Sequence, residues 1–133
     1  MNQLLRFPTS VRRDPEIDAW FETRPDELGS LARRWFEVMR ACGNDVRELL
    51  HDWHPTACVG DAAFGYVNAF TSHVNVGFFR GTELEDPADM LEGSGKFMRH
   101  GNLDPASKSM TMRLRGSLSR RILISNAARN HDN

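Results

Sequence analysis

The chain has 133 residues, of which 40% are hydrophobic and 26% charged, and its formal net charge is −1. This length supports a single domain with its own core, and the composition is typical of a globular protein rather than a disordered one. No run approaches the ~20 consecutive apolar residues of a membrane-spanning helix. The small net charge neither favours nor excludes a nucleic-acid partner. Because the N-terminus has no apolar stretch of signal-peptide length, we expect a cytoplasmic protein.

Residues 1–13 have no sustained periodicity and predict a loose lead-in, followed by one domain over 14–129 and a tail over 130–133. The two cysteines, Cys42 and Cys58, have neither a Cys-x-x-Cys nor a zinc-like spacing. We therefore expect two free, mostly buried thiols in a reducing compartment.

Three helices are predicted in the N-terminal half. Asp14-Pro15 is typical of an N-cap followed by proline at the first helical position, and this first helix ends by Pro25. A longer helix over 25–42 has an apolar stripe at three- and four-residue steps, formed by Leu28, Leu31, Trp35, Val38 and Met39. A third helix over 45–53 is predicted from the similar spacing of Val46, Leu49, Leu50 and Trp53.

After residue 63 apolar residues recur at every second position, which is typical of strands. Residues 64–70 and 73–79 predict a hairpin that turns at Thr71-Ser72 and pairs Asn68 with Asn75. One face of this hairpin has core character, formed by Val67, Ala69, Val74, Val76 and Phe78, and we expect the helix over 25–42 to lie across it. The other face mixes rings with polar groups, namely Phe64, Tyr66, Asn68, Phe70, His73, Asn75 and Phe79. Residues 96–103 predict a third strand, and a C-terminal helix is expected from about Leu118.

The segment from Trp53 to Leu103 resembles the YdhG-like family of small bacterial domains of unknown function. The residues that carry the resemblance are Pro55, the aromatic strand entering Ser72-His73-Val74, the phenylalanine- and glycine-containing end of the next strand, Asp86-Pro87, Gly95-Lys96 and Arg99. The resemblance implies an α+β fold, similar to frataxin, with N-terminal helices packed on one face of a small antiparallel sheet and a C-terminal helix. It also implies weak iron binding, because some members are described as frataxin-like iron chaperones. After Leu103 the chain is basic and poorly periodic, and it departs from the family pattern.

Clustered carboxylates are the ligands that hard cations prefer. Five acidic residues and no basic residue occur between Glu83 and Glu92. The candidate iron ligands are Glu83, Glu85, Asp86 and Asp89, and the alternative interpretation is a solvated acidic loop. His51 and His54 also have a spacing found at metal sites, but the sequence offers no clear third ligand, so two surface histidines near a helix end are the alternative.

The mixed face of the hairpin is the candidate ligand site. Tyr66, Asn68, His73 and Asn75 supply hydrogen-bonding groups between apolar rings, as small-molecule pockets do. Lys96 and Arg99 from the third strand would make this site favour an anion. The run from Gly93 to Lys96 does not satisfy the P-loop pattern, which excludes a nucleotide triphosphatase of that class. The alternative interpretation is a structural sheet face that the C-terminal segment half covers.

Catalysis has little support, because the candidate nucleophiles Ser72, Cys58 and Cys42 have no recognisable base partner. We therefore predict a non-enzymatic binding module that takes a small, anionic ligand or weakly binds iron. The alternative is an interaction protein whose basic C-terminal third contacts nucleic acid or an acidic protein partner. Eight basic residues between Lys96 and Arg129 favour that alternative.

Overall fold

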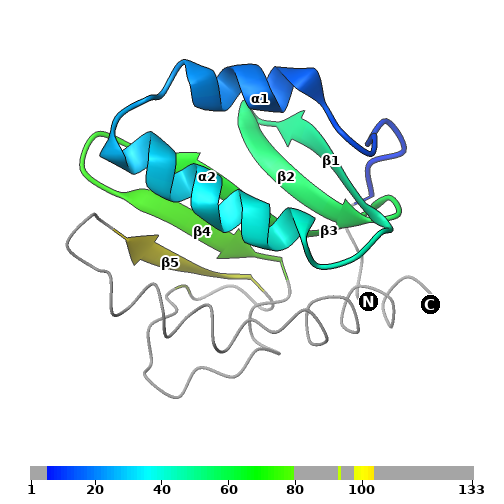
Figure 1. Cartoon of the computed structure of the whole chain (residues 1–133). Coiled ribbons are helices and arrows are strands. Elements are labelled where there is room, and N and C mark those ends of the chain that lie inside the picture. Colours follow the sequence, from blue (N-terminus) through cyan, green and yellow to red (C-terminus); the bar gives the residue numbers. More distant parts are fainter. Residues whose placement is uncertain (1–5, 80–92, 94–97, 104–133) are drawn as a thin grey trace.

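Two helices precede five strands in the computed structural model, which describes residues 6–79, 93 and 98–103 (Figure 1). The elements are α1 (Pro15–Glu22), α2 (Glu27–Arg40), β1 (Val46–His51), β2 (His54–Val59), β3 (Ala62–Ala69), β4 (Val74–Phe78) and β5 (Arg99–Leu103). The strands form one antiparallel sheet in which each strand pairs with its neighbour in the chain. This arrangement confirms the α+β class with an antiparallel sheet. No helix in the described part of the chain is long and apolar enough to cross a membrane.

Both helices begin after an aspartate N-cap, which the sequence indicated at Asp14, whereas the second helix, predicted to start at Pro25, starts at Glu27 after Asp26. The Asp14 carboxylate accepts a hydrogen bond from the backbone N–H of Glu16, and the Asp26 carboxylate accepts one from Gly29. These side chains satisfy backbone donors that have no partner within the first turn of a helix. A Cβ on Gly29 would lie 1.8 Å from the Arg24 carbonyl oxygen, so only glycine allows the tight connection between α1 and α2.

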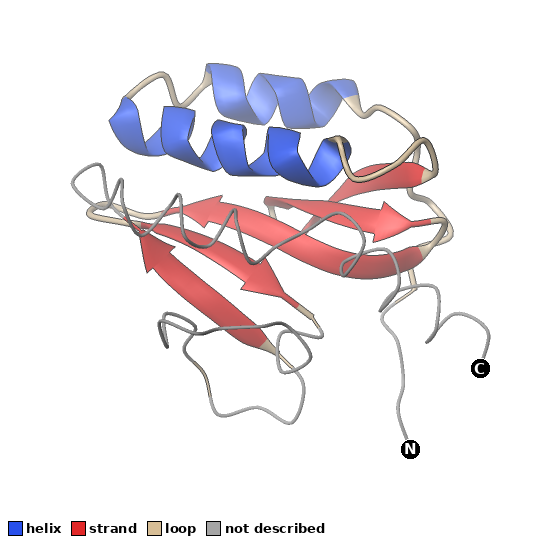
Figure 2. Cartoon of the chain, turned by 60° about the horizontal axis from the view of Figure 1, so that its bottom comes forward, coloured by secondary structure: helices blue, strands red, loops and turns tan. Residues whose placement is uncertain are grey.

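The two helices lie side by side on one face of the sheet, with α1 over β1 and β2 and α2 over β3 and β4 (Figures 1 and 2). The apolar stripe of α2 supplies Leu31, Trp35 and Met39 to the core between the two layers. The sheet contributes Val67, Val74, Val76 and Phe78 from the predicted core face of the hairpin, all of them buried. The core predictions are therefore confirmed for these residues, whereas Leu28, Val38 and Ala69 are only partly buried.

The predicted helix over 45–53 is wrong, because this segment forms β1 and the turn that follows it. Asp52 and Trp53 have φ angles of 51° and 66°, and two such residues in succession close a two-residue hairpin turn. The adjacent Leu49 and Leu50 imitate a helical stripe, and a glutamate occupies the buried position between Val46 and Leu50. Because of both features, apolar and polar residues do not alternate along this segment as they do in a typical strand.

The strand β2 was not predicted from the sequence. Five consecutive residues of this strand, Pro55 to Val59, are buried, so apolar and polar positions do not alternate. A strand covered on both faces has no period of two in its hydrophobicity.

The predicted hairpin register is confirmed. Tyr66 pairs with Gly77 and Asn68 pairs with Asn75, and the Phe70 N–H donates to the carbonyl oxygen of His73. The predicted position of Phe64 on the mixed face is wrong. The pairing of β2 with β3 shifts between Ala57 and Cys58, which leaves Phe64 as the extra residue of a bulge, and its ring joins the core. β5 begins at Arg99, and the predicted C-terminal helix lies outside the described residues.

The described part of the lead-in, residues 6–13, is attached to the sheet by two isolated bridges and by further hydrogen bonds. Arg6 forms an isolated bridge with Ala62, and Val11 forms one with Glu48 on the outer edge of β1. The guanidinium of Arg47 also donates two hydrogen bonds to the Ser10 carbonyl oxygen, at 2.7 and 3.1 Å. Both cysteine thiols are buried, as expected.

Candidate functional site

The face of the sheet turned away from α1 and α2 carries a group of partly exposed polar and aromatic side chains. Paired residues of adjacent strands share a face, so the register defines this group. We call it the polar face, and it comprises His54, Tyr66, Asn68, Asn75, Phe79, His100 and Asn102. Three of its residues form an asparagine row, because Asn75 on β4 pairs with Asn68 on one side and with Asn102 on the other.

A series of ring contacts runs along the polar face beside the asparagine row. The ring of Tyr66 lies between His54, at a centroid distance of 4.8 Å, and Phe79, at 5.6 Å. His51 lies 6.3 Å from His54, and Phe7 of the lead-in lies 4.7 Å from His51. The rings thus make an apolar surface next to amide groups that can both donate and accept hydrogen bonds.

Gly77 on β4 is the reason that Tyr66 can lie flat across the sheet. A Cβ at position 77 would lie 1.9 Å from an atom of the Tyr66 ring, so any side chain there would displace it. Burial raises the pKa of the Tyr66 phenol above its ordinary value. Tyr66 is therefore protonated at neutral pH and presents an O–H donor.

His54 is also neutral at pH 7. Burial lowers the pKa of this imidazole, and the nearby His51 lowers it further, although Asp52 acts in the opposite direction. Asn68 and Asn75 have no charge. The centre of the polar face is therefore made of neutral hydrogen-bonding groups.

The side-chain oxygen Oδ1 of Asn75 is buried and, within the described part of the chain, accepts no hydrogen bond. The corresponding oxygen of its neighbour Asn68 accepts a hydrogen bond from the backbone N–H of Ala69 at 2.9 Å. A buried polar atom without a partner costs about 1–3 kcal/mol, and native proteins contain few of them. Such an atom in the middle of a polar surface indicates a place where a ligand or a water molecule donates.

The predicted ligand residues do not all lie together. Tyr66, Asn68 and Asn75 share the polar face, and the ring of His73 stacks on Phe70 at the hairpin turn, with centroids 4.8 Å apart. Arg99 instead pairs with Phe78, a core residue, so it belongs to the helix side of β5. Lys96 lies outside the described residues, as do Glu83, Glu85, Asp86 and Asp89, so the predicted iron site is not described.

Two residues of the polar face, His100 and Asn102, were not identified from the sequence as site residues. Because side chains alternate along a strand, His100 and Asn102 lie on one face of β5 and Arg99 lies on the other. The local sequence does not show which of these faces also carries Tyr66. His54 was considered from the sequence only as a partner of His51 near a helix end, and not as part of the ligand site. The structure makes it the register partner of His51 across the β1–β2 turn. In the described part of the chain, no three His, Cys, Asp or Glu side chains lie close enough together to hold a metal ion.

The buried thiol of Cys58 does not have the properties of a nucleophile. Burial raises its pKa to about 12, with a further contribution from Asp61, so the thiolate is not populated at neutral pH. Ser72, another candidate, lies at the exposed turn of the hairpin.

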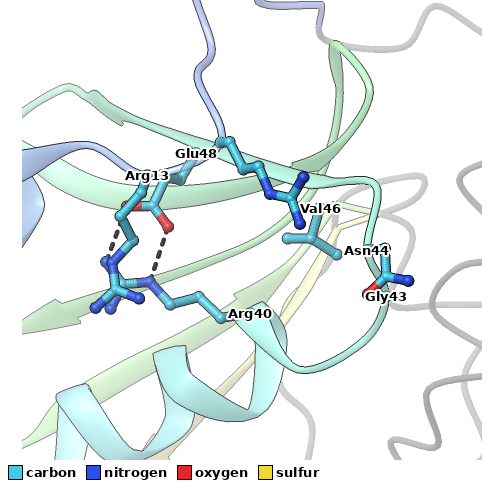
Figure 3. A pocket seen from close by; sticks show the side chains of 7 residues that line it. Arg13, Arg40, Gly43, Asn44, Val46 and Glu48 are labelled. Carbon is cyan, nitrogen blue, oxygen red and sulfur yellow. Dashed lines mark hydrogen bonds and ion pairs between the residues drawn. The ribbon is translucent and has the colours of Figure 1, made fainter.

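A hollow of about 630 Å³ lies away from the polar face, where the lead-in meets the end of α2 and the start of β1 (Figure 3). Its lining residues are Arg12, Arg13, Arg40, Gly43, Asn44, Val46 and Glu48. Although three arginines suggest an anion site, Arg40 already donates to the carboxylates of Glu48, Glu37 and Asp18. The cationic charge of Arg40 is therefore balanced within the protein, and this hollow is formed around a structural salt-bridge network.

No protein-family model, curated protein or solved structure matches this chain.

Proposed function

We propose that the chain is a non-enzymatic binding module that holds a small planar ligand on the polar face. The observation that carries the proposal is the buried, unpartnered Oδ1 of Asn75 in the described structure. A ligand N–H placed against this atom would supply the missing hydrogen bond, and the bond would be strong because the site is partly shielded from water.

The rings beside Asn75 favour a flat ligand. Tyr66, His54 and Phe79 form a surface on which a planar group can stack, and aromatic contacts of this kind are worth about 0.5–1.5 kcal/mol beyond the area that they bury. The asparagine row offers amide donors and acceptors to the edge of the same group. A nitrogen heterocycle with an N–H and a carbonyl on its edge combines these properties.

The neutral centre of the polar face favours recognition of an uncharged group. Arg99, expected to bind an anion there, belongs to the other side of β5. The ligand class that we propose is therefore a nucleobase-like or nicotinamide-like ring. Any charged substituent would lie at the margin of the polar face.

We also propose that the chain is a YdhG-like domain with a frataxin-like fold. The supporting observations are the helices that precede the strands and their position on one face of an antiparallel sheet. The motifs between Trp53 and Leu103 that carry the resemblance are the other support for this proposal.

A thermal-shift screen tests the proposed function directly. The probes are free purine and pyrimidine bases and nicotinamide, with benzoate as a charged planar control. A probe at a hundred times its dissociation constant adds about 2.7 kcal/mol to the free energy of unfolding. We expect a rise in melting temperature for at least one uncharged heterocycle and none for benzoate. A screen in which no uncharged heterocycle raises the melting temperature contradicts the proposal.

A further inference from the structure

The side chain of Trp53 is 83% exposed at the tip of the β1–β2 turn, and its φ angle of 66° lies in the left-handed region. Bulky residues rarely adopt this conformation, because it brings Cβ close to the following carbonyl oxygen. Asparagine and glycine are the residues that such turns favour. Neither the turn geometry nor the packing of the core therefore explains an exposed tryptophan at this position.

The turn that bears Trp53 is held firmly by α1. The indole Nε1 of Trp20 donates a hydrogen bond to the Trp53 carbonyl oxygen at 2.7 Å. Trp20 is buried, and the guanidinium carbon of Arg24 lies 3.8 Å from the centre of its ring. Trp53 thus projects from a fixed base, which lowers the entropy that it would lose on contact with another molecule.

A hollow of about 580 Å³ lies next to Trp53, between α1 and the end of β1. We call it the Trp53 groove, and it is lined by Glu16, Ala19, Trp20, Thr23, Arg24, Leu50 and Trp53. Most of its lining surface is apolar, and tryptophan is among the residues most enriched at the centres of protein interfaces.

The groove adjoins the outer edge of the sheet, because β1 is the first strand. At this edge the Glu48 N–H donates to the Val11 carbonyl oxygen at 2.6 Å, and the Val11 N–H donates to the Glu48 carbonyl oxygen at 2.9 Å. Alternate residues direct their backbone groups to the same side of a strand, so those of Leu50 point to the same edge. Within the described chain only Val11 pairs with this edge of β1, which leaves the end near the groove accessible to an extended segment.

The charges around the groove indicate which charge a partner segment should carry. Glu16 is exposed on the α1 side, and the carboxylate of Asp52, beside Trp53, is 79% exposed although one of its oxygens lies 3.4 Å from Nε2 of His51. The one cationic group of the lining, Arg24, stacks on Trp20 and donates to the carbonyl oxygen of that residue at 3.0 Å. We propose that the Trp53 groove is a docking surface for an extended segment of a partner protein in which basic and apolar residues alternate. The apolar residues enter the groove, and the basic ones meet Glu16 and Asp52.

The test is fluorescence anisotropy of a labelled peptide with alternating lysine and leucine, compared with one that alternates glutamate and leucine. We expect the full chain to bind the basic peptide and not the acidic one. Trp53→Ser should weaken binding at least about tenfold, because it removes the central aromatic contact. Phe70→Ser is the matched control, since Phe70 is an exposed ring at the other hairpin turn, and it should leave binding unchanged.

The double variant Glu16→Gln, Asp52→Asn tests the role of the two carboxylates beside the groove. It should weaken binding of the basic peptide and reduce the dependence of that binding on salt.

The variants must remain folded, and we expect Trp53→Ser to melt no lower than the unmodified chain. The proposal is overturned if the basic peptide does not bind at concentrations up to about 1 mM. Equal loss in Trp53→Ser and Phe70→Ser also overturns it. Sedimentation that shows a dimer dissociated by Trp53→Ser assigns the groove to a second copy instead, and Trp53-dependent binding to anionic vesicles assigns it to a membrane surface.

Discussion

Arg40 and Glu48 form a two-point salt bridge in which Nε and Nη2 of the guanidinium each donate to one carboxylate oxygen, both at 2.8 Å. The Glu48 side chain is only 1% exposed, and one of its oxygens also accepts the backbone N–H of Asp14 at 2.9 Å. The pair thus joins the last turn of α2, the middle of β1 and the start of α1. Burial alone would lower the pKa of Arg40, but its bonds with Glu48 and Glu37 outweigh that effect and raise it.

Replacing one partner of this pair should destabilise the protein severely. Arg40→Met leaves the Glu48 carboxylate buried without its counter-charge, and removal of one partner of a buried pair typically costs about 3–5 kcal/mol. Urea denaturation should show this loss in the free energy of unfolding. Arg34→Met is the control, because Arg34 is exposed on α2. The double variant Arg40→Met, Glu48→Leu should recover much of the loss, and a double variant as unstable as Arg40→Met would contradict our interpretation.

Gly77→Ala should disturb the polar face through Tyr66. The new methyl group would overlap the Tyr66 ring, which must rotate away or push β4 aside, and overpacking of this kind costs about 1–3 kcal/mol. Thermal unfolding measures the cost. In a Tyr66→Ala background the same Gly77→Ala change should be nearly neutral, because no ring remains to be displaced. An equal cost in both backgrounds would show that the glycine is required for another reason.

The hairpin at the centre of the site was predictable because all its determinants are local. Asn68 and Asn75 are separated by seven positions, and alternation on both sides of Thr71-Ser72 set their register. The asparagine row could not be extended from sequence, because its third member, Asn102, comes from a strand that follows a long connection. The error at β1 has a different origin. The Glu48 carboxylate is buried by its pairing with Arg40 of α2, a tertiary contact that hydrophobic periodicity does not encode.

His54 should make stability depend on pH. Its pKa in the folded protein is lowered below the ordinary 6.5, so the unfolded chain binds a proton more readily. The contribution of His54 to stability is therefore complete above about pH 6.5 and is lost as the pH falls below that value. An NMR titration of the imidazole should give a pKa below 6.5. A value near 6.5 would mean that His54 is open to water, and a value above 6.5 would mean that it gains a carboxylate partner.

Val76→Asp should unfold the domain. Val76 is fully buried at the centre of β4, where α2 covers the sheet, and its replacement by aspartate buries a charge without a partner. The cost of several kcal/mol is comparable with the whole stability of a domain of this size. Circular dichroism should show loss of the cooperative melting transition. His100→Asp, on the polar face, is the control and should remain folded. A cooperative Val76→Asp protein with an unchanged midpoint would contradict the assignment of the two faces.

Asn75→Leu should raise the stability of the free protein while it removes the proposed ligand contact. The change removes a buried acceptor that has no partner in the described structure, so the free protein should become more stable by about 1–3 kcal/mol. Asn68→Leu is the matched control, because Asn68 already accepts a hydrogen bond from Ala69, and it should not stabilise the chain. Urea denaturation of both variants checks this prediction, and a destabilised Asn75→Leu protein would show that Oδ1 of Asn75 has a partner in the free state.

The most direct test of the proposed function is an NMR titration of the side-chain amides with the heterocycle that raises the melting temperature most. We predict saturable shifts of the Asn75 amide and the Tyr66 ring, and loss of binding in the stabilised Asn75→Leu variant. Saturable shifts confined to residues around Arg12 and Arg13, or unchanged affinity in Asn75→Leu, would contradict a ligand site on the polar face.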